Sequence, residues 1–146
     1  MFINGRLFVG GMADYKLTIS DPKTGKSVKK DLGGSAADAL LTKDVGDKVA
    51  GDTLGFTGYE FEITGGSDNA GFPLRKGIRG IGRKKIFTYR GVGFSGRNRW
   101  GKTQKGLRVK KTVSGSRVTP QTTQVNLKIL KEGSQTLFVA KEEKKE

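Results

Sequence analysis

The sequence contains no cysteine and no histidine. Without cysteine, the chain has neither a disulfide framework nor a thiolate metal site. Without histidine, it lacks the commonest metal ligand and the usual general base of enzymes. No apolar run approaches the roughly 18 residues that a membrane-spanning helix needs. We therefore expect a cytoplasmic protein with no cofactor, no metal, no membrane and no small-molecule substrate.

Apolar residues are also scarce, at 34% of the sequence, whereas 23 of the 146 residues are glycine. A chain of this length suffices for one domain, which buries roughly 68–70% of its unfolded surface. We expect a small hydrophobic core with many turns.

Acidic residues are absent from residues 69–131, which carry 17 Lys and Arg. Residues 1–68 hold eight basic and ten acidic side chains, and residues 132–146 hold three and four. The net charge of +14 is therefore confined to one basic block, residues 69–131. Such a block repels itself in a free globule, and a polyanion would neutralise it.

Alternation of apolar and polar residues, typical of half-buried strands, runs through much of the chain. It predicts strands at residues 15–20, 27–32, 59–64, 85–90, 107–113, 125–129 and 137–139. Ser35 is expected to cap a short helix over residues 36–41. Residues 45–49 are expected to form a turn-rich connection.

These elements predict a mainly β fold: a single small antiparallel β-barrel-like domain with one or two short helices and a long Gly-rich basic loop. We place the domain at residues 13–133, with residues 134–146 as a short last strand and a charged tail. Residues 1–12 are expected to be an N-terminal extension. We hypothesise that Met12 is the biological start; the alternative is that the first residues add a short edge strand.

Two strings match phosphate-binding motifs but lack the surroundings that such motifs need. Residues 96–103 fit the P-loop pattern GxxxxGK[ST], which must follow a buried strand and open a helix. The residues after it look like a strand, and no Asp follows Asp68 to hold Mg²⁺. Residues 91–96 have the dinucleotide spacing GxGxxG without the helix or the ribose-binding carboxylate. We interpret both strings as parts of a Gly-rich basic segment, residues 91–106, which we expect to be a loop or a long hairpin that is ordered only when bound.

Glu60 and Glu62 are the candidate acid–base pair, because paired carboxylates can transfer protons. However, residues two positions apart on a strand point to the same face, so a solvent-exposed strand face would also place these two carboxylates together. We favour the solvated face, and we expect no catalytic residue and no enzyme.

Aromatic residues are interleaved with the cations of the basic block, at Phe87, Tyr89, Phe94 and Trp100. A membrane-surface protein would show an amphipathic helix, but the block has no helical period. Arginine suits bidentate phosphate contact, and exposed aromatic rings stack on unpaired bases. This combination favours structured RNA over lipid. We expect Phe87 and Tyr89 to pack in the core, and Trp100 to be the best stacking candidate.

The residues predicted to contact RNA are the cations of the block from residue 75 to residue 117, together with its tryptophan. They are Arg75, Lys76, Arg79, Arg83, Lys84, Lys85, Arg90, Arg97, Arg99, Trp100, Lys102, Lys105, Arg108, Lys110, Lys111 and Arg117.

The string ITGGSDNAGFPLRKG, residues 63–77, resembles the signature of small-subunit ribosomal protein six of the archaeal/eukaryotic type, with Leu74 in place of the usual Met. Supporting similarity lies at residues 17–26, 45–55, 97–115 and 124–133, so that the resemblance covers about residues 14–133. The signature loop that it marks comprises Gly65, Gly66, Asp68, Gly71, Phe72 and Pro73.

The resemblance implies a structural constituent of the small ribosomal subunit, located in the cytoplasm within the ribosome. Its implied partners are ribosomal RNA, bound through residues 69–131, and neighbouring ribosomal proteins. Eukaryotic relatives carry a long basic C-terminal helix that this sequence lacks, which implies the short archaeal form. The alternative is a free-standing RNA chaperone or regulatory RNA-binding module, and a nucleotide hydrolase ranks third.

Within this reading, the signature loop has two possible roles. Its glycine N–H groups could face phosphate, or the loop could set the register of two strands. We favour the second role for Gly65, Gly66, Gly71 and Pro73, and RNA contact for Arg75 and Lys76.

Overall fold

The computed structural model describes residues 14–133 and Leu137. Within that part of the chain, strands dominate and helices are short. The elements are β1 (Tyr15–Ser20), β2 (Ser27–Leu32), α1 (Ser35–Asp38), β3 (Lys48–Ala50), the 3-10 helix η1 (Gly51–Leu54), β4 (Glu60–Asp68), β5 (Arg83–Thr88), β6 (Val109–Ser114) and β7 (Thr122–Lys131). The expected mainly β fold with short helices is confirmed.

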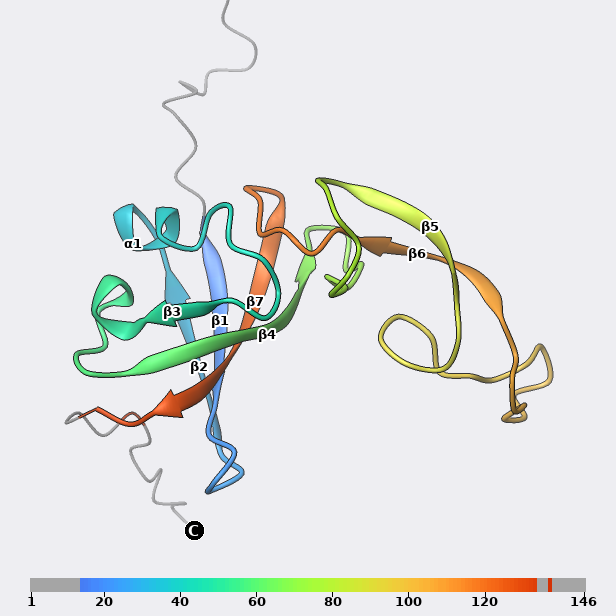
Figure 1. Cartoon of the computed structure of the whole chain (residues 1–146), viewed down its shortest axis with the longest axis horizontal. Helices are drawn as coiled ribbons and strands as arrows, with labels where there is room; N and C mark the ends of the chain where they lie inside the picture. Colours follow the sequence, from blue (N-terminus) through green and yellow to red (C-terminus); the bar gives the residue numbers. More distant parts are fainter. Residues whose placement is uncertain (1–13, 134–136, 138–146) are drawn as a thin grey trace, which may run out of the picture.

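The strands form a five-stranded sheet of order β2-β1-β7-β4-β3 and a separate two-stranded sheet of β5 and β6 (Figure 1). Three of the four pairings in the larger sheet are antiparallel. The fourth, between β1 and β7, is parallel, with Leu17 opposite Val125 and Ile19 opposite Leu127. The expectation of a wholly antiparallel domain is therefore wrong.

The expected barrel-like architecture is not confirmed, because the larger sheet does not close. Strands β2 and β3 lie at its two edges, and each pairs with one neighbour among the described strands. The sheet is twisted enough that β4 runs across the direction of β1 and β2 (Figure 1). The segment after η1 then approaches β2 through side chains, with Lys30 Nζ 4.7 Å from the centre of the Phe56 ring. Between β2 and the segment after η1 there is thus a side-chain contact, where a closed barrel would need backbone hydrogen bonds between strands.

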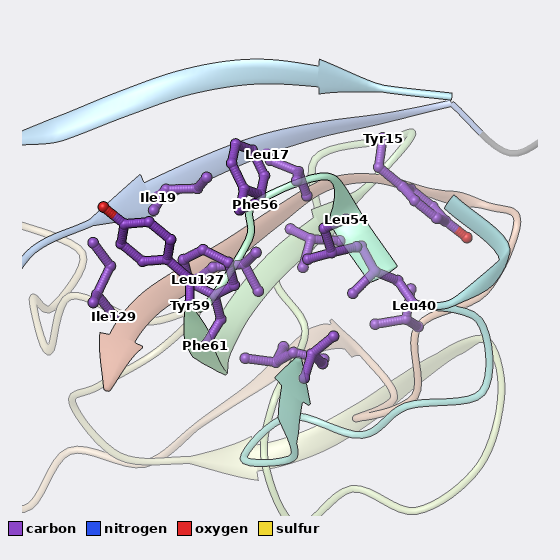
Figure 2. Packing of buried hydrophobic residues seen from close by; sticks show 14 of the residues in the cluster. Tyr15, Leu17, Ile19, Leu40, Leu54, Phe56, Tyr59, Phe61, Leu127 and Ile129 are labelled. Carbon is purple, nitrogen blue, oxygen red and sulfur yellow. The ribbon is translucent and has the colours of Figure 1, made fainter. Parts of the chain in front are cut away.

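The core lies on the concave face of the larger sheet, under α1 and η1 (Figure 2). Alternate residues of the long strands point into it, and Phe61 and Ile63 of β4 are fully buried. The ring of Phe61 packs edge-on against Phe56 and stacks on Tyr59, both at 5.7 Å. Each buried side chain of this size contributes roughly 1.5–3 kcal/mol. The other inward residues of β1 and β7 are Tyr15, Leu17, Ile19, Val125, Leu127 and Ile129.

Two local expectations differ from the structure. Helix α1 begins at Ser35 and is preceded by Gly34 with φ of 68°, so the Ser35 hydroxyl makes no capping hydrogen bond. Strand β3 forms where a turn-rich connection was expected, by pairing Val49 with Phe61 of β4. The expected N-terminal extension (residues 1–12), the last strand at 137–139 and the charged tail lie outside the described residues, apart from Leu137.

Candidate RNA-binding surface

Strands β5 and β6, with the turns that join them, form an extended arm, defined here as residues 83–114. Figure 1 shows the arm reaching away from the larger sheet, with the joining turns at its far end. The arm contains 11 Lys and Arg and no acidic residue. The densest part of the positive charge therefore lies outside the folded core, on an element that is accessible from several sides.

Asp68, the last residue of β4, anchors the arm to the larger sheet. Its carboxylate is buried and accepts hydrogen bonds from the backbone N–H groups of Ala70 and Phe72, both at 2.9 Å. Its other oxygen accepts from Nε of Arg83, the first residue of β5, at 2.7 Å. The Arg83 guanidinium also donates to Asn69 at 2.9 Å and lies 5.2 Å from the Phe72 ring. One carboxylate thus shapes the signature loop and holds the base of the arm.

The pKa of Asp68 reflects these contacts. Burial alone would raise it, but the hydrogen bonds from Arg83, Phe72 and Ala70 outweigh burial and hold the pKa below its ordinary value. The carboxylate is therefore charged at neutral pH, as its pairing with Arg83 requires.

Backbone contacts join the same loop to the other strand of the arm. The N–H of Ser114 in β6 donates to the carbonyl of Pro73 at 2.9 Å, and Leu74 forms a parallel bridge with Ser114. The guanidinium of Arg75 donates to the Thr88 hydroxyl and, at 3.3 Å, to the carbonyl of Val92. The signature loop and the two residues after it therefore contact both strands of the arm at its base.

Gly66 in the signature loop is required by a close approach of two strands. A Cβ atom at this position would lie 2.2 Å from the backbone oxygen of Gln124 in β7 and 3.0 Å from the Leu74 side chain. At Gly65, by contrast, no atom lies within 4 Å of the added Cβ. Gly66 thus permits the close approach of β4 to β7, whereas no such contact explains Gly65.

The two faces of the arm differ sharply in exposure. On one face Thr88 and Val113 are buried. The turn at residues 91–94 folds back against this face, so that a Cβ at Gly93 would lie 3.2 Å from Val113 and Lys111 Nζ lies 5.7 Å from the centre of the Phe94 ring. Pro73 of the signature loop closes the same side near Gly93. This covered face forms a small satellite core that stiffens the arm.

The other face is open. Strand register places Phe87 opposite Lys110 and Lys85 opposite Thr112, so these side chains share one side of the ladder. Within the strands, Lys110 lies 5.9 Å from the centre of the Phe87 ring. Just beyond the strands, Arg108 lies 5.1 Å from the centre of the Tyr89 ring. We define the open face as Lys85, Phe87, Tyr89, Arg108, Lys110 and Thr112.

The expectation that Phe87 and Tyr89 pack in the core is wrong. They are 65% and 55% exposed, since the satellite core takes the opposite face of the hairpin. Exposed aromatic rings beside cations offer both a stacking surface and phosphate contacts. Trp100, in the joining turns, is 79% exposed, as its polar surroundings suggested.

Residues 91–106 form a chain of short turns rather than one long Gly-rich loop or hairpin. Gly91 and Phe94 exchange backbone hydrogen bonds, and the Asn98 side chain accepts from the N–H groups of Trp100 and Lys102, both at 3.0 Å. The segment contains no helix. The P-loop-like and dinucleotide-like strings therefore lack the helix N-terminus on which phosphate binding at such motifs depends.

The predicted RNA-contact residues divide into exposed groups and groups that hold the fold. All are exposed except Arg75, which is half-buried and bonded to the arm. Two of the exposed cations form ion pairs within the described residues, Arg83 with Asp68 and Arg117 with Asp44 at 3.6 Å. The remaining exposed cations form no ion pair there.

Glu60 and Glu62 are ion-paired on the outer side of the larger sheet, with Lys131 at 2.9 Å and Lys128 at 3.0 Å. The hydrogen bonds from these lysines lower the pKa of each carboxylate. A lowered pKa suits a structural ion pair better than a proton-transfer group at neutral pH. In the described residues, no three His, Cys, Asp or Glu side chains cluster as metal ligands would, and no helix is long and apolar enough to cross a membrane.

The sequence also contained a signal for the open face. Phe87 and Tyr89 are two residues apart at the end of one strand, and Arg108 and Lys110 are two residues apart at the start of the other. Their pairing becomes visible only when the strand register is known.

Comparison with known proteins places the chain in a family. Residues 15–140 match the profile described as Ribosomal protein S6e. The chain is 37% identical to "Small ribosomal subunit protein eS6" of Methanoculleus marisnigri over 86% of its own length and 91% of the relative's. The protein of the same name from Methanocorpusculum labreanum is 42% identical over 81% of this chain and 87% of its own length. The one from Haloarcula marismortui is 38% identical over 84% of this chain and 91% of its own length. This chain therefore belongs to the ribosomal protein S6e family.

Proposed function

We propose that this protein is a structural constituent of the small ribosomal subunit and that it binds ribosomal RNA through its basic arm. The observation that carries the proposal is the open face, where exposed cations and aromatic rings alternate without any acidic neighbour on the arm. The relatives are named as small-subunit proteins, and they match along most of their length. The implied location is the cytoplasmic ribosome, with neighbouring ribosomal proteins as further partners.

The charge distribution supports RNA rather than a protein or lipid partner. Cations on both faces and in the joining turns would follow a folded phosphate backbone. If about 6–10 phosphates are neutralised, the affinity falls some 10³–10⁵-fold between 50 and 200 mM salt, by analogy with duplex DNA. Membership of a ribosomal protein family also agrees with the expectation that the chain is not an enzyme.

The open face is tested with two triple variants that remove the same charge. The arm variant carries Lys85→Gln, Arg108→Gln and Lys110→Gln. The body variant carries Lys16→Gln, Lys26→Gln and Lys29→Gln, three exposed lysines with no ion pair among the described residues. Binding to small-subunit ribosomal RNA is measured by fluorescence anisotropy over a range of salt concentrations.

We expect the arm variant to lower the salt slope of log K by about two to three units, close to one per lost phosphate contact. The body variant should change that slope by much less. Equal losses in the two variants would contradict binding through the open face, since net charge alone would then explain the affinity.

The alternative, a free-standing RNA chaperone or regulatory RNA-binding module, shares the same surface chemistry. It differs in predicting protein that is free of ribosomal subunits in cell lysate, and the family relationship favours the ribosomal role.

A further inference from the structure

We propose that the arm holds one unpaired nucleotide of an RNA strand in a cleft beside the open face. The cleft is lined by Tyr89, Arg90, Thr103, Gln104, Lys105, Gly106 and Leu107 and encloses about 360 Å³. This inference rests on the proposed function and names the RNA feature that the arm would select, an extruded base rather than a continuous duplex.

The size of the cleft suits a single nucleotide. Ligand pockets range over roughly 300–1,000 Å³, and a volume near the lower limit admits one base with its sugar but not paired strands. The joining turns that form one wall are held by backbone hydrogen bonds within the arm, from Gln104 N–H to the Gly96 carbonyl and from Leu107 N–H to the Gln104 carbonyl.

The wall of the cleft is shaped by a tight turn. The N–H of Leu107 donates to the carbonyl of Gln104, and Gly106 has φ of 77°, the left-handed conformation that the third position of such a turn demands. Opposite, the Arg90 side chain packs across Gly96, where an added Cβ would lie 2.8 Å from it. The aliphatic part of this cationic side chain therefore lies against the backbone of Gly96.

The lining has the chemistry of a nucleotide site. Tyr89 is 55% exposed and presents an aromatic surface on which a base can stack, while Arg108 lies over the ring at 5.1 Å. Arg90 and Lys105 supply positive charge for the flanking phosphates. Thr103 and Gln104 carry donors and acceptors for a base edge or a ribose hydroxyl.

A free nucleotide has the same base and phosphate, but the surroundings favour a nucleotide within a strand. Arg97, Arg99 and Lys102 continue the positive charge beyond the cleft, and all three are exposed. A mononucleotide would leave these cations unused, whereas the strand on either side of an extruded base would meet them.

The test uses a fully paired RNA hairpin and the same hairpin with one bulged 2-aminopurine. Base–aromatic stacking is worth about 1–3 kcal/mol, so the bulged RNA should bind about 5- to 150-fold more tightly. Stacking on Tyr89 should also quench the 2-aminopurine fluorescence. Adenosine monophosphate at micromolar concentration should not displace the RNA, and displacement at that concentration would overturn the assignment to an RNA strand.

Variants locate the stacking surface. Tyr89→Leu should abolish the preference for the bulged RNA and the quenching, whereas Tyr89→Phe, which keeps the ring, should retain both. Trp100→Leu is the matched control, since it removes a more exposed aromatic residue of the arm that does not line the cleft. Loss of the preference in Trp100→Leu but not in Tyr89→Leu would overturn the proposal.

The two proposals fail in different ways. Salt-dependent binding of equal strength to both hairpins would refute the cleft and leave the proposed function intact. Absence of salt-dependent binding to either RNA would refute the proposed function itself.

Discussion

The pairing of Asp68 with Arg83 should be energetically coupled, and a double-mutant cycle measures that coupling. Asp68→Asn keeps an oxygen for the N–H groups of Ala70 and Phe72 but removes the charge that faces Arg83. Arg83→Gln removes the cation from the other side. The fourth protein of the cycle carries both changes.

The expected magnitude follows from the burial of the two partners. The Asp68 side chain is 5% exposed and its oxygen lies 2.7 Å from Arg83 Nε, so the contact is a charge-assisted hydrogen bond, worth about 1.5–3 kcal/mol. The Arg83 side chain is 42% exposed, and water competes for it. We therefore expect a coupling energy at the lower end, about 1.5 kcal/mol. Asp68→Asn alone should lower the unfolding temperature by about 5–10 °C.

The free energy of unfolding is measured with urea by far-ultraviolet circular dichroism. Trp100 emission is unsuitable as a probe, because that side chain is exposed in the folded protein. Glu132→Gln, which breaks the exposed pair with Lys23, serves as the control and should leave the midpoint unchanged. A coupling energy below about 0.3 kcal/mol would refute the anchoring role of Asp68.

The same pair predicts a pH dependence. The pKa of Asp68 is lowered in the folded protein, so the unfolded state binds more protons at acidic pH. The stabilisation is fully present above the unfolded pKa, about 3.9, and is lost as pH falls through the lower folded value. The stability difference between the wild type and Asp68→Asn should therefore shrink below about pH 4. A difference that is constant down to pH 2 would contradict this account.

Two further predictions test the packing of the larger sheet. Gly66→Ala should destabilise the protein by about 3 kcal/mol, because the added Cβ would meet the Gln124 backbone oxygen. Gly65→Ala, which meets no atom, should be nearly neutral. Equal losses of unfolding free energy in urea would refute the close-approach argument. Burial, with the nearby Asp38 charge, raises the pKa of Tyr15 to about 12. The unfolded state therefore ionises first, and the stability of the fold should fall above about pH 10. Tyr15→Phe should lose that pH dependence. A Tyr15→Phe protein with an unchanged alkaline profile in circular dichroism would contradict the second prediction.

The strands were predictable where burial on one face is strong. Tyr15, Leu17 and Ile19 point into the core and their neighbours do not, so the alternation reports the burial directly. Strand β3 has three residues, too few to show a period, and it forms because β4 offers a partner edge. The parallel pairing of β1 and β7 joins segments that are far apart in the sequence, and no local pattern encodes it.

The location of the candidate site was predictable from charge, but the roles of its residues were not. Alternation at Phe87 and Tyr89 indicates a strand, yet it does not say which face of a two-stranded hairpin another segment will cover. Here the turn that contains Phe94 covers the opposite face. Similarly, composition marked Arg75 and Arg83 as cations, but only the fold reveals that they hold the arm to the signature loop.

The central claim is that the protein is a ribosomal constituent held by its arm. The most direct measurement is its sedimentation in a sucrose gradient of native lysate, with the small-subunit fraction then washed at about 1 M salt, where the Debye length is about 3 Å. We predict that the protein tracks the small subunit in stoichiometric amount and largely survives the wash, because shape and stacking add to charge. Protein that remains at the top of the gradient, or that washes off completely, would contradict the claim and favour the free-standing RNA-binding module.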